Sequence, residues 1–262
     1  KGDSLYYEKN NGYGKAIGNI QLIDTIQNTI ILGGIAEYYE KTNQIEITKK
    51  PILQLLFKTD TLFMSADRFL SYKTVNDKKL LAFKNVKFFK KDFQGKCDSL
   101  SYIFSDSLLE MYNNPVIWIN QFQMTADSLK AIIFNSKLES IYLKNNSMII
   151  EDDSLDYNQI KGKEMLCSFK ENKLKKIKIL GNGQSIFFVK DDENNKIGLN
   201  YFESTDLTLY FIDNGLNEIT YHIKPESKTI PYKELTTKDK YLKEFFWRIN
   251  EKPTNKYDIF TE

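Results

Sequence analysis

The sequence predicts an all-β protein built from repeated pairs of antiparallel strands. Three observations predict this fold class. Apolar and polar residues alternate with a period of two, a unit of about 30 residues recurs along the chain, and strand-forming residues dominate the composition. The 262 residues include 16 Tyr and 18 Phe, with 41% hydrophobic residues overall. A chain of this size can bury a sizeable core, in one large or two ordinary domains.

The repeat is clearest in CDSLSYIFSDSLLEMYNNPVIW, residues 97–118. It consists of an acid after a small residue, an alternating stretch, a polar turn, a second alternating stretch and a second break. Seven copies align on their acids, which we expect to be turn or edge residues that prevent wrong strand pairing. These acids are Asp3, Glu37, Asp67, Asp98, Asp127, Glu164 and Asp206.

Turn signals divide each copy into two strands. The polar turns fall at residues 9–12, 42–43, 76–77, 105–106, 135–136, 171–172 and 213–215. The second breaks fall at Asn19, Pro51, Asn85, Pro115, Asn146, Asn182 and Pro225. Two acidic runs, residues 151–153 and 191–193, look like hairpin tips.

About 14 strands would be unusual as one flat open sheet, so we expect the sheet to fold over and bury its apolar face. The interior is then either a core filled by its own side chains or a groove for the acyl chains of a lipid. In PVIWI, alternation does not decide which face is inward, but burying the large aromatic favours the face of Trp118. The candidate groove residues are Ile20, Leu22, Leu100, Tyr102, Val116, Trp118, Ile177 and Ile179.

The C-terminal region departs from the repeat. In TTKDKYLKEFFWRINEKP, apolar residues recur at helical spacing, Thr237 can cap a helix and Pro253 can stop one. We expect a short helix near residues 238–249 that covers the last open strand, as repeat arrays need caps. The expected domains are a repeat domain over residues 1–230 and a cap over residues 231–262.

Several classes of function are poorly supported. The net charge of +2 does not produce the strongly positive potential that is typical of nucleic-acid-binding proteins. No apolar run is long enough to cross a membrane. Cys97 and Cys167 have no metal-ligand spacing, and we expect them not to form a disulfide. The only histidine, His222, reads as an ordinary sheet residue, and the glycines of residues 181–185 read as a turn. We therefore predict no enzymatic activity, no metal and no cofactor.

The ordered recurrence of several short motifs resembles the OstA-like family of periplasmic lipopolysaccharide-transport proteins, in its Bacteroidetes-type version. The motifs are GYGKAIGNIQLID, ADRFLSYKTVNDKKLLAFKNVKFF, QGKCDSLSY, NNPVIW, MTADSL, YNQIKGKEM and GNGQSIFF. The resemblance covers roughly residues 2–225. It implies a repetitive antiparallel β-jellyroll, or β-taco, which the expected helix would cap, and it implies no catalytic residues. The chain is longer than one bridge unit of better-known bacteria. Because it begins Lys-Gly-Asp-Ser, we expect an excised or processed piece whose targeting segment has been removed.

The resemblance implies a periplasmic bridge that carries lipopolysaccharide toward the outer membrane, possessing a groove for lipid A acyl chains. Its expected partners are other jellyroll domains of the transport system, or second copies, joined end to end through strand edges. A different hypothesis is a structural or adhesive β-repeat protein with a filled core and no lipid cargo. A carbohydrate-active β-solenoid ranks behind both hypotheses.

Overall fold

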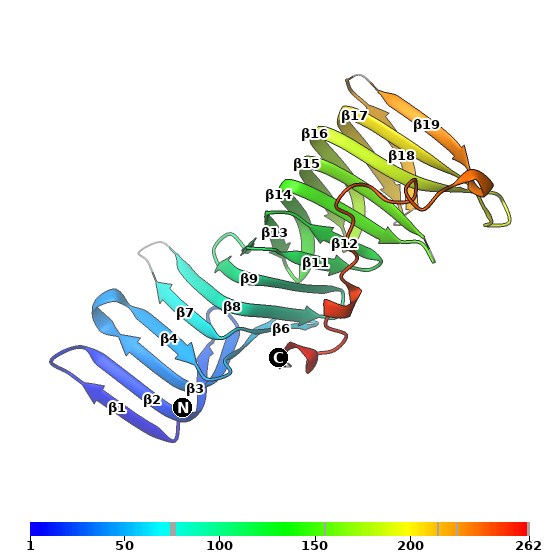
Figure 1. The fold of residues 1–262 in the computed structure, drawn as a ribbon. Helices are drawn as coiled ribbons and strands as arrows, with labels where there is room; N and C mark the ends of the chain where they lie inside the picture. Colours follow the sequence, from blue (N-terminus) through cyan, green and yellow to red (C-terminus); the bar gives the residue numbers. More distant parts are fainter. Residues whose placement is uncertain (74–76, 155, 214, 224, 261–262) are drawn as a thin grey trace. The chain divides into compact units, whose positions relative to one another are not determined.

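The computed structural model describes residues 1–73, 77–154, 156–213, 215–223 and 225–260, and most of them lie in antiparallel strands (Figure 1). The predicted fold class, a repetitive antiparallel β-jellyroll, is confirmed. Strands β1 to β10 are Ser4–Glu8, Tyr13–Asp24, Thr29–Tyr39, Gln44–Thr48, Ile52–Leu56, Thr61–Ser65, Arg68–Lys73, Lys78–Lys90, Phe93–Ile103 and Leu108–Tyr112. Strands β11 to β19 are Val116–Ile119, Phe122–Thr125, Ser128–Phe134, Lys137–Asp152, Tyr157–Lys170, Lys173–Lys190, Lys196–Ile212, Gly215–Tyr221 and Glu226–Pro231.

The chain forms two compact units. The first unit contains residues 1–115, 130–137 and 251–262, and the second contains residues 116–129 and 138–250. The predicted boundary near residue 230 stays a prediction.

Within each unit the long strands bend in the middle, so that their two halves belong to two walls. In the first unit, wall A contains β1, β4, β7, β10 and one half each of β2, β3, β8 and β9, and wall B contains β5, β6 and the other halves. In the second unit, wall A contains β18 and one half each of β14 to β17, and wall B contains β11, β12, β19 and the other halves. The ring centroids of Phe122 in wall B and Phe211 in wall A lie 6.1 Å apart. This contact fixes which faces of the second unit's walls point inward.

Two consecutive residues with positive φ, a conformation that asparagine and glycine tolerate better than other residues, make the bends in β2, β8, β14 and β16 and the corners between β4 and β5 and between β10 and β11. The pairs are 18–19, 49–50, 84–85, 113–114, 145–146 and 181–182. Each pair contains or immediately precedes one of the breaks predicted from the sequence, and the seventh break, Pro225, lies between β18 and β19. The expected turns also lie between strands, although Asn76 and Asn214 fall outside the described residues.

Five of the seven aligned acids stabilise these bends. The side-chain amide of Asn19 donates a hydrogen bond of 2.9 Å to Asp3, and Asn146 donates one of 2.9 Å to Asp127. The same pairing joins the carboxylates at positions 67 and 98 to the asparagines at 85 and 113. Asp206 accepts a bond from the backbone N–H of Gly181. The expectation of a turn or edge residue is wrong for Glu37 and Glu164, which lie within strands and accept bonds from tyrosine hydroxyls.

We expect Asn146→Ala to lower the free energy of unfolding by about 1–2 kcal/mol, because alanine is strained at positive φ and lacks the amide that binds Asp127. Asn146→Gly is the matched control, since it also removes the amide but tolerates the backbone conformation. Urea denaturation measures both variants. A glycine variant as unstable as the alanine variant would show that the hydrogen bond, and not the backbone, accounts for the loss.

The expected helix near residues 238–249 is wrong. Within residues 231–260, which the structure describes, the helical residues form three short 3₁₀ turns, Tyr232–Glu234, Ile249–Glu251 and Asp258–Phe260. Residues 240–248 instead form an irregular strap that is bound by side chains of β12 and β15. These contacts place the strap on wall B of the second unit, and the expected cover over the last strand stays a prediction.

Candidate functional site

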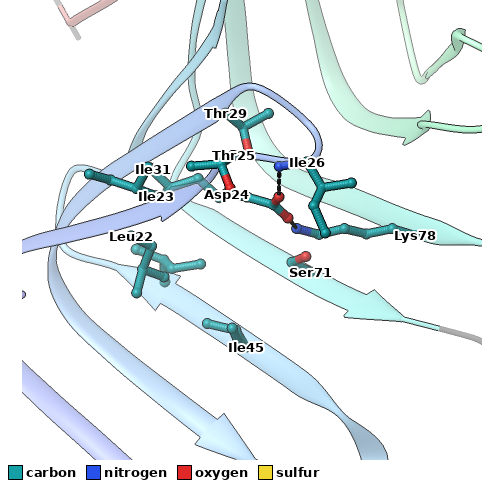
Figure 2. Close-up of a pocket in the computed structure, with 11 residues that line it drawn as sticks. Leu22, Ile23, Asp24, Thr25, Ile26, Thr29, Ile31, Ile45, Ser71 and Lys78 are labelled. Atoms are coloured by element: carbon teal, nitrogen blue, oxygen red, sulfur yellow. Dashed lines mark hydrogen bonds and ion pairs between the residues drawn. The ribbon is translucent and has the colours of Figure 1, made fainter.

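A pocket of about 300 Å³ opens between the two walls of the first unit (Figure 2). Wall B supplies residues of β2, β3 and the turn between them, and wall A supplies residues of β4, β7 and β8. The lining is mainly aliphatic, with a few polar groups at its edge. The lining residues are Leu22, Ile23, Asp24, Thr25, Ile26, Thr29, Ile31, Ile45, Ile47, Ser71 and Lys78.

The alternation of the strands explains why these residues meet. Leu22 lies opposite Ile31 in the pairing of β2 with β3, so both side chains project from the same face of wall B. Ile45 lies opposite Ser71 in the pairing of β4 with β7, so both project from wall A. Because the strands bend, the two apolar faces are opposed, and a volume near the lower end of the range of about 300–1,000 Å³ for ligand pockets remains between them.

An ion pair joins the walls at the edge of this pocket. The Lys78 ammonium, at the start of β8, donates a hydrogen bond to the Asp24 carboxylate at the end of β2. Figure 2 shows the two side chains pointing toward each other. Burial would raise the pKa of Asp24, but Lys78 and the backbone N–H groups of Gln27 and Ile26 outweigh it and hold that pKa below its ordinary value.

The lowered pKa of Asp24 predicts a defined pH dependence. A carboxylate whose pKa is lower in the folded state stabilises the fold at neutral pH, and this contribution is lost as the pH falls through the folded pKa. We expect Asp24→Asn to be less stable than the wild type by up to about 1 kcal/mol at pH 7. The difference should shrink and then vanish as the pH falls below about 3.9, the ordinary pKa of aspartate. Urea titrations at several pH values measure it, and a difference that grew on acidification would contradict the assignment.

Six of the eight residues predicted to form the groove lie on inner faces. Leu22 lines the pocket, and Ile20 lies two residues before it on the same strand face. Leu100 and Tyr102 share, through paired strands, the face of Ile47 and Ile45. Ile177 and Ile179 lie opposite Leu209 and Leu207 in the second unit, on the face of Phe211. Leu22 is half-buried, and the other five are buried. Their binding of lipid stays a prediction.

The inward orientation expected for Val116 and Trp118 is wrong. Trp118 lies opposite Gln123 in the pairing of β11 with β12, so both project from one face. Gln123 binds the C-terminal strap, while Phe122 projects from the other face toward the interior. Val116 and Trp118 therefore face the strap side, and Ile117 and Ile119 face inward. Trp118 is fully buried in either case, which is why burial of a large aromatic alone could not identify the inner face.

Sequence reasoning missed most of the pocket, including Asp24, Ile45, Ser71 and Lys78. Asp24 ends the alternating stretch NIQLID on the same strand face as Ile20 and Leu22, so the period of two could have indicated it. Lys78 was not predictable, since its approach to Asp24 depends on the bends that bring residues 54 positions apart together.

The other reactive groups are buried or engaged within the structure. Cys97 and Cys167 are buried free thiols, and burial raises the pKa of Cys97 to about 12, which keeps the thiol protonated and unreactive. A ring nitrogen of His222 lies 2.9 Å from the Thr208 hydroxyl. Among the described residues, no group of three or more His, Cys, Asp or Glu side chains is arranged to hold a metal. That part of the chain also contains no helix with the length and apolar character needed to span a membrane.

Comparisons with known proteins give a structural likeness and no sequence-level match. No protein-family model matches the sequence, and no curated protein matches it. One of the solved structures that match is that of LptH, described as the LptA homologous periplasmic component of the conserved lipopolysaccharide transport device from Pseudomonas aeruginosa. The match has a TM-score of 0.40 and 8% sequence identity, and it covers 53% of this chain and 94% of LptH.

Proposed function

We propose that this chain binds lipid acyl chains between its walls and acts as a periplasmic bridge that passes lipopolysaccharide toward the outer membrane. The observation that supports the acyl-binding part is the pocket of the first unit, whose two opposed aliphatic faces leave about 300 Å³ between them. Apolar ligands gain about 0.8 kcal/mol per methylene removed from water in such a site. The cargo and the compartment rest on the sequence motifs. The proposed role requires binding and no catalysis.

The proposal includes end-to-end association with a jellyroll partner or a second copy. The support is strand β1, where Leu5 and Tyr7 lie opposite Ala16 and Gly14 and so extend the inner face of wall A. Leu5 is 72% exposed and Tyr7 is 54% exposed. A partner strand added at β1 would cover this apolar surface and continue the inner face from one molecule to the next.

A fluorescent fatty acid and purified lipopolysaccharide, each titrated against the full chain, test the proposal. Ser71 is buried at the pocket wall, so Ser71→Phe should fill the cavity and weaken binding at least tenfold. Ser105→Phe is the matched control, because Ser105 is exposed in the turn between β9 and β10. Circular dichroism checks that both variants fold. Binding by wild type and Ser71→Phe with equal affinity would reject this pocket, and no binding by any of the three would reject the lipid function.

A structural β-repeat protein without cargo is the second candidate, and the second unit favours it. The inner-face residues Ile177, Ile179, Leu207 and Leu209 have no exposed surface. Their side chains fill the space between the walls as a protein core does. Under this second proposal neither ligand binds, and Ser71→Phe changes only stability.

A further inference from the structure

The strap, residues 240–248, is held against wall B of the second unit by two buried glutamines. Gln159 donates to the carbonyl oxygen of Lys240 at 2.7 Å and accepts from the N–H of Leu242 at 2.8 Å. Gln123 makes the same two bonds six residues further along the strap. It donates to the carbonyl oxygen of Phe246 at 2.8 Å and accepts from the N–H of Arg248 at 2.6 Å. Each side-chain amide thus binds a backbone carbonyl of the strap and the backbone N–H two residues later. The main chain of a neighbouring strand would bind the strap in the same way.

The wall between the glutamines is shaped for one apolar side chain. Gln123 lies opposite Ile150, and Gln159 lies opposite Ile186, so the glutamines and both isoleucines share one face. Leu242 enters the cluster that these isoleucines form with Met148, Phe188 and Leu199. Leu242 is 6% exposed, and the two glutamines are almost completely buried.

Aromatic and charged contacts orient the rest of the strap. The ring of Tyr157 lies 5.2 Å from the ring of Phe245 and 5.2 Å from that of Trp247. A turn closed by the bond from the Phe245 N–H to the Leu242 carbonyl takes up the chain between the two glutamines. Lys240 pairs with the buried Asp156 at 3.0 Å, and Lys161 pairs with Glu244 at 2.8 Å. The wall therefore recognises a backbone pattern, one leucine and two opposite charges.

We propose that this face of wall B is a peptide-binding site, that the strap is its resident ligand, and that the strap of a second copy can replace it. The glutamines contact only backbone atoms, so they bind the segment of another copy as they bind their own. The charged partners and the leucine cluster are matched to this segment's sequence, which makes a second copy the fitting occupant. A segment held by side chains, outside the strand ladders, is also expected to open more readily than the strands. This inference does not depend on the lipid function.

A labelled peptide with the sequence of residues 232–250 tests the inference by fluorescence anisotropy with the full chain. In the chain, Leu242→Asp places a carboxylate in the apolar cluster and should release the resident strap. We expect the peptide to bind this variant at least tenfold more tightly than the wild type, whose own strap competes. Adding Gln123→Leu and Gln159→Leu should remove the gain.

Peptide chemistry supplies the matched control. N-methylation at Leu242 and Arg248 removes the two N–H groups whose hydrogen bonds the glutamines accept, and it should weaken binding at least tenfold. N-methylation at Tyr241 and Trp247, one residue away from each donor, should weaken it far less. Equal binding of the two methylated peptides would overturn the glutamine assignment.

Hydrogen exchange of the wild-type chain is the second measurement and needs no variant. The amides of Leu242 and Arg248 should exchange faster than the amides of β15 and β16, and the free peptide in excess should not protect those strands further. Exchange of the strap amides only at the rate of global unfolding would overturn the proposal, as would failure of the peptide to bind the Leu242→Asp chain. Leu242→Ala, a milder change, replaces Leu242→Asp in the binding assay if the charged variant does not fold.

Discussion

Trp118→Asp is expected to lower the free energy of unfolding by more than about 4 kcal/mol, enough to abolish the folded state of many domains. The side chain is fully buried beside Gln123, under the face that carries the strap. The change removes a large apolar contact and leaves a carboxylate without a partner in an apolar environment. Urea denaturation followed by circular dichroism measures the loss.

Two controls separate the causes of this loss. Phe246→Asp puts the same charge on the strap at a side chain that is 68% exposed, and it should change stability by less than about 0.5 kcal/mol. Trp118→Phe keeps a buried ring and removes an indole N–H that has no hydrogen-bond partner among the described residues, so it should be far milder than Trp118→Asp. A stable Trp118→Asp protein would mean that this face of β11 is open to water.

Phe69→Ala is expected to destabilise the first unit by about 3–5 kcal/mol, because Phe69 is fully buried on the inner face of wall A. It lies opposite Ile47 and two residues before Ser71, both of which line the pocket. The cavity left by the ring would therefore extend the pocket. If the pocket binds acyl chains, a fatty acid should restore part of the lost stability, since an apolar cavity that stays dry can take an apolar ligand.

Thermal denaturation with and without fatty acid measures this effect. Phe134→Ala, at an exposed phenylalanine of the first unit, is the control and should lose little stability with no recovery on adding ligand. A Phe69→Ala protein that is destabilised as expected but unaffected by fatty acid would favour the filled-core alternative. A protein that loses less than about 1 kcal/mol would contradict the placement of Phe69 in the core.

The repeat was predictable because its signals are local. Asn19, Asn85 and Asn146 mark bends by their own conformational preference, and the alternation of strands follows from neighbours two residues apart. The fold class therefore followed from the sequence alone. The pocket did not, since Ile31 and Ile45 meet only after the bends bring the two walls face to face.

The strap shows why a local signal can fail. Leu242, Phe245 and Ile249 recur at helical spacing, and a helix would satisfy its own backbone. The structure satisfies that backbone instead with Gln123 and Gln159, which lie more than 80 positions earlier in the chain. No pattern within the C-terminal region indicates these partners, so tertiary hydrogen bonds override the helical periodicity.

The paired acids and asparagines at the bends have a consequence for how such a protein evolves. Asp3 binds Asn19, Asp67 binds Asn85, and Asp127 binds Asn146, so each of these segments contains both partners of its own bend. Recombination that duplicates or deletes one such segment therefore leaves every carboxylate and amide of the neighbouring segments with its hydrogen-bond partner. Chain length in this lineage can therefore change in steps of about two strands, and natural variants should differ by whole segments more often than by single strands.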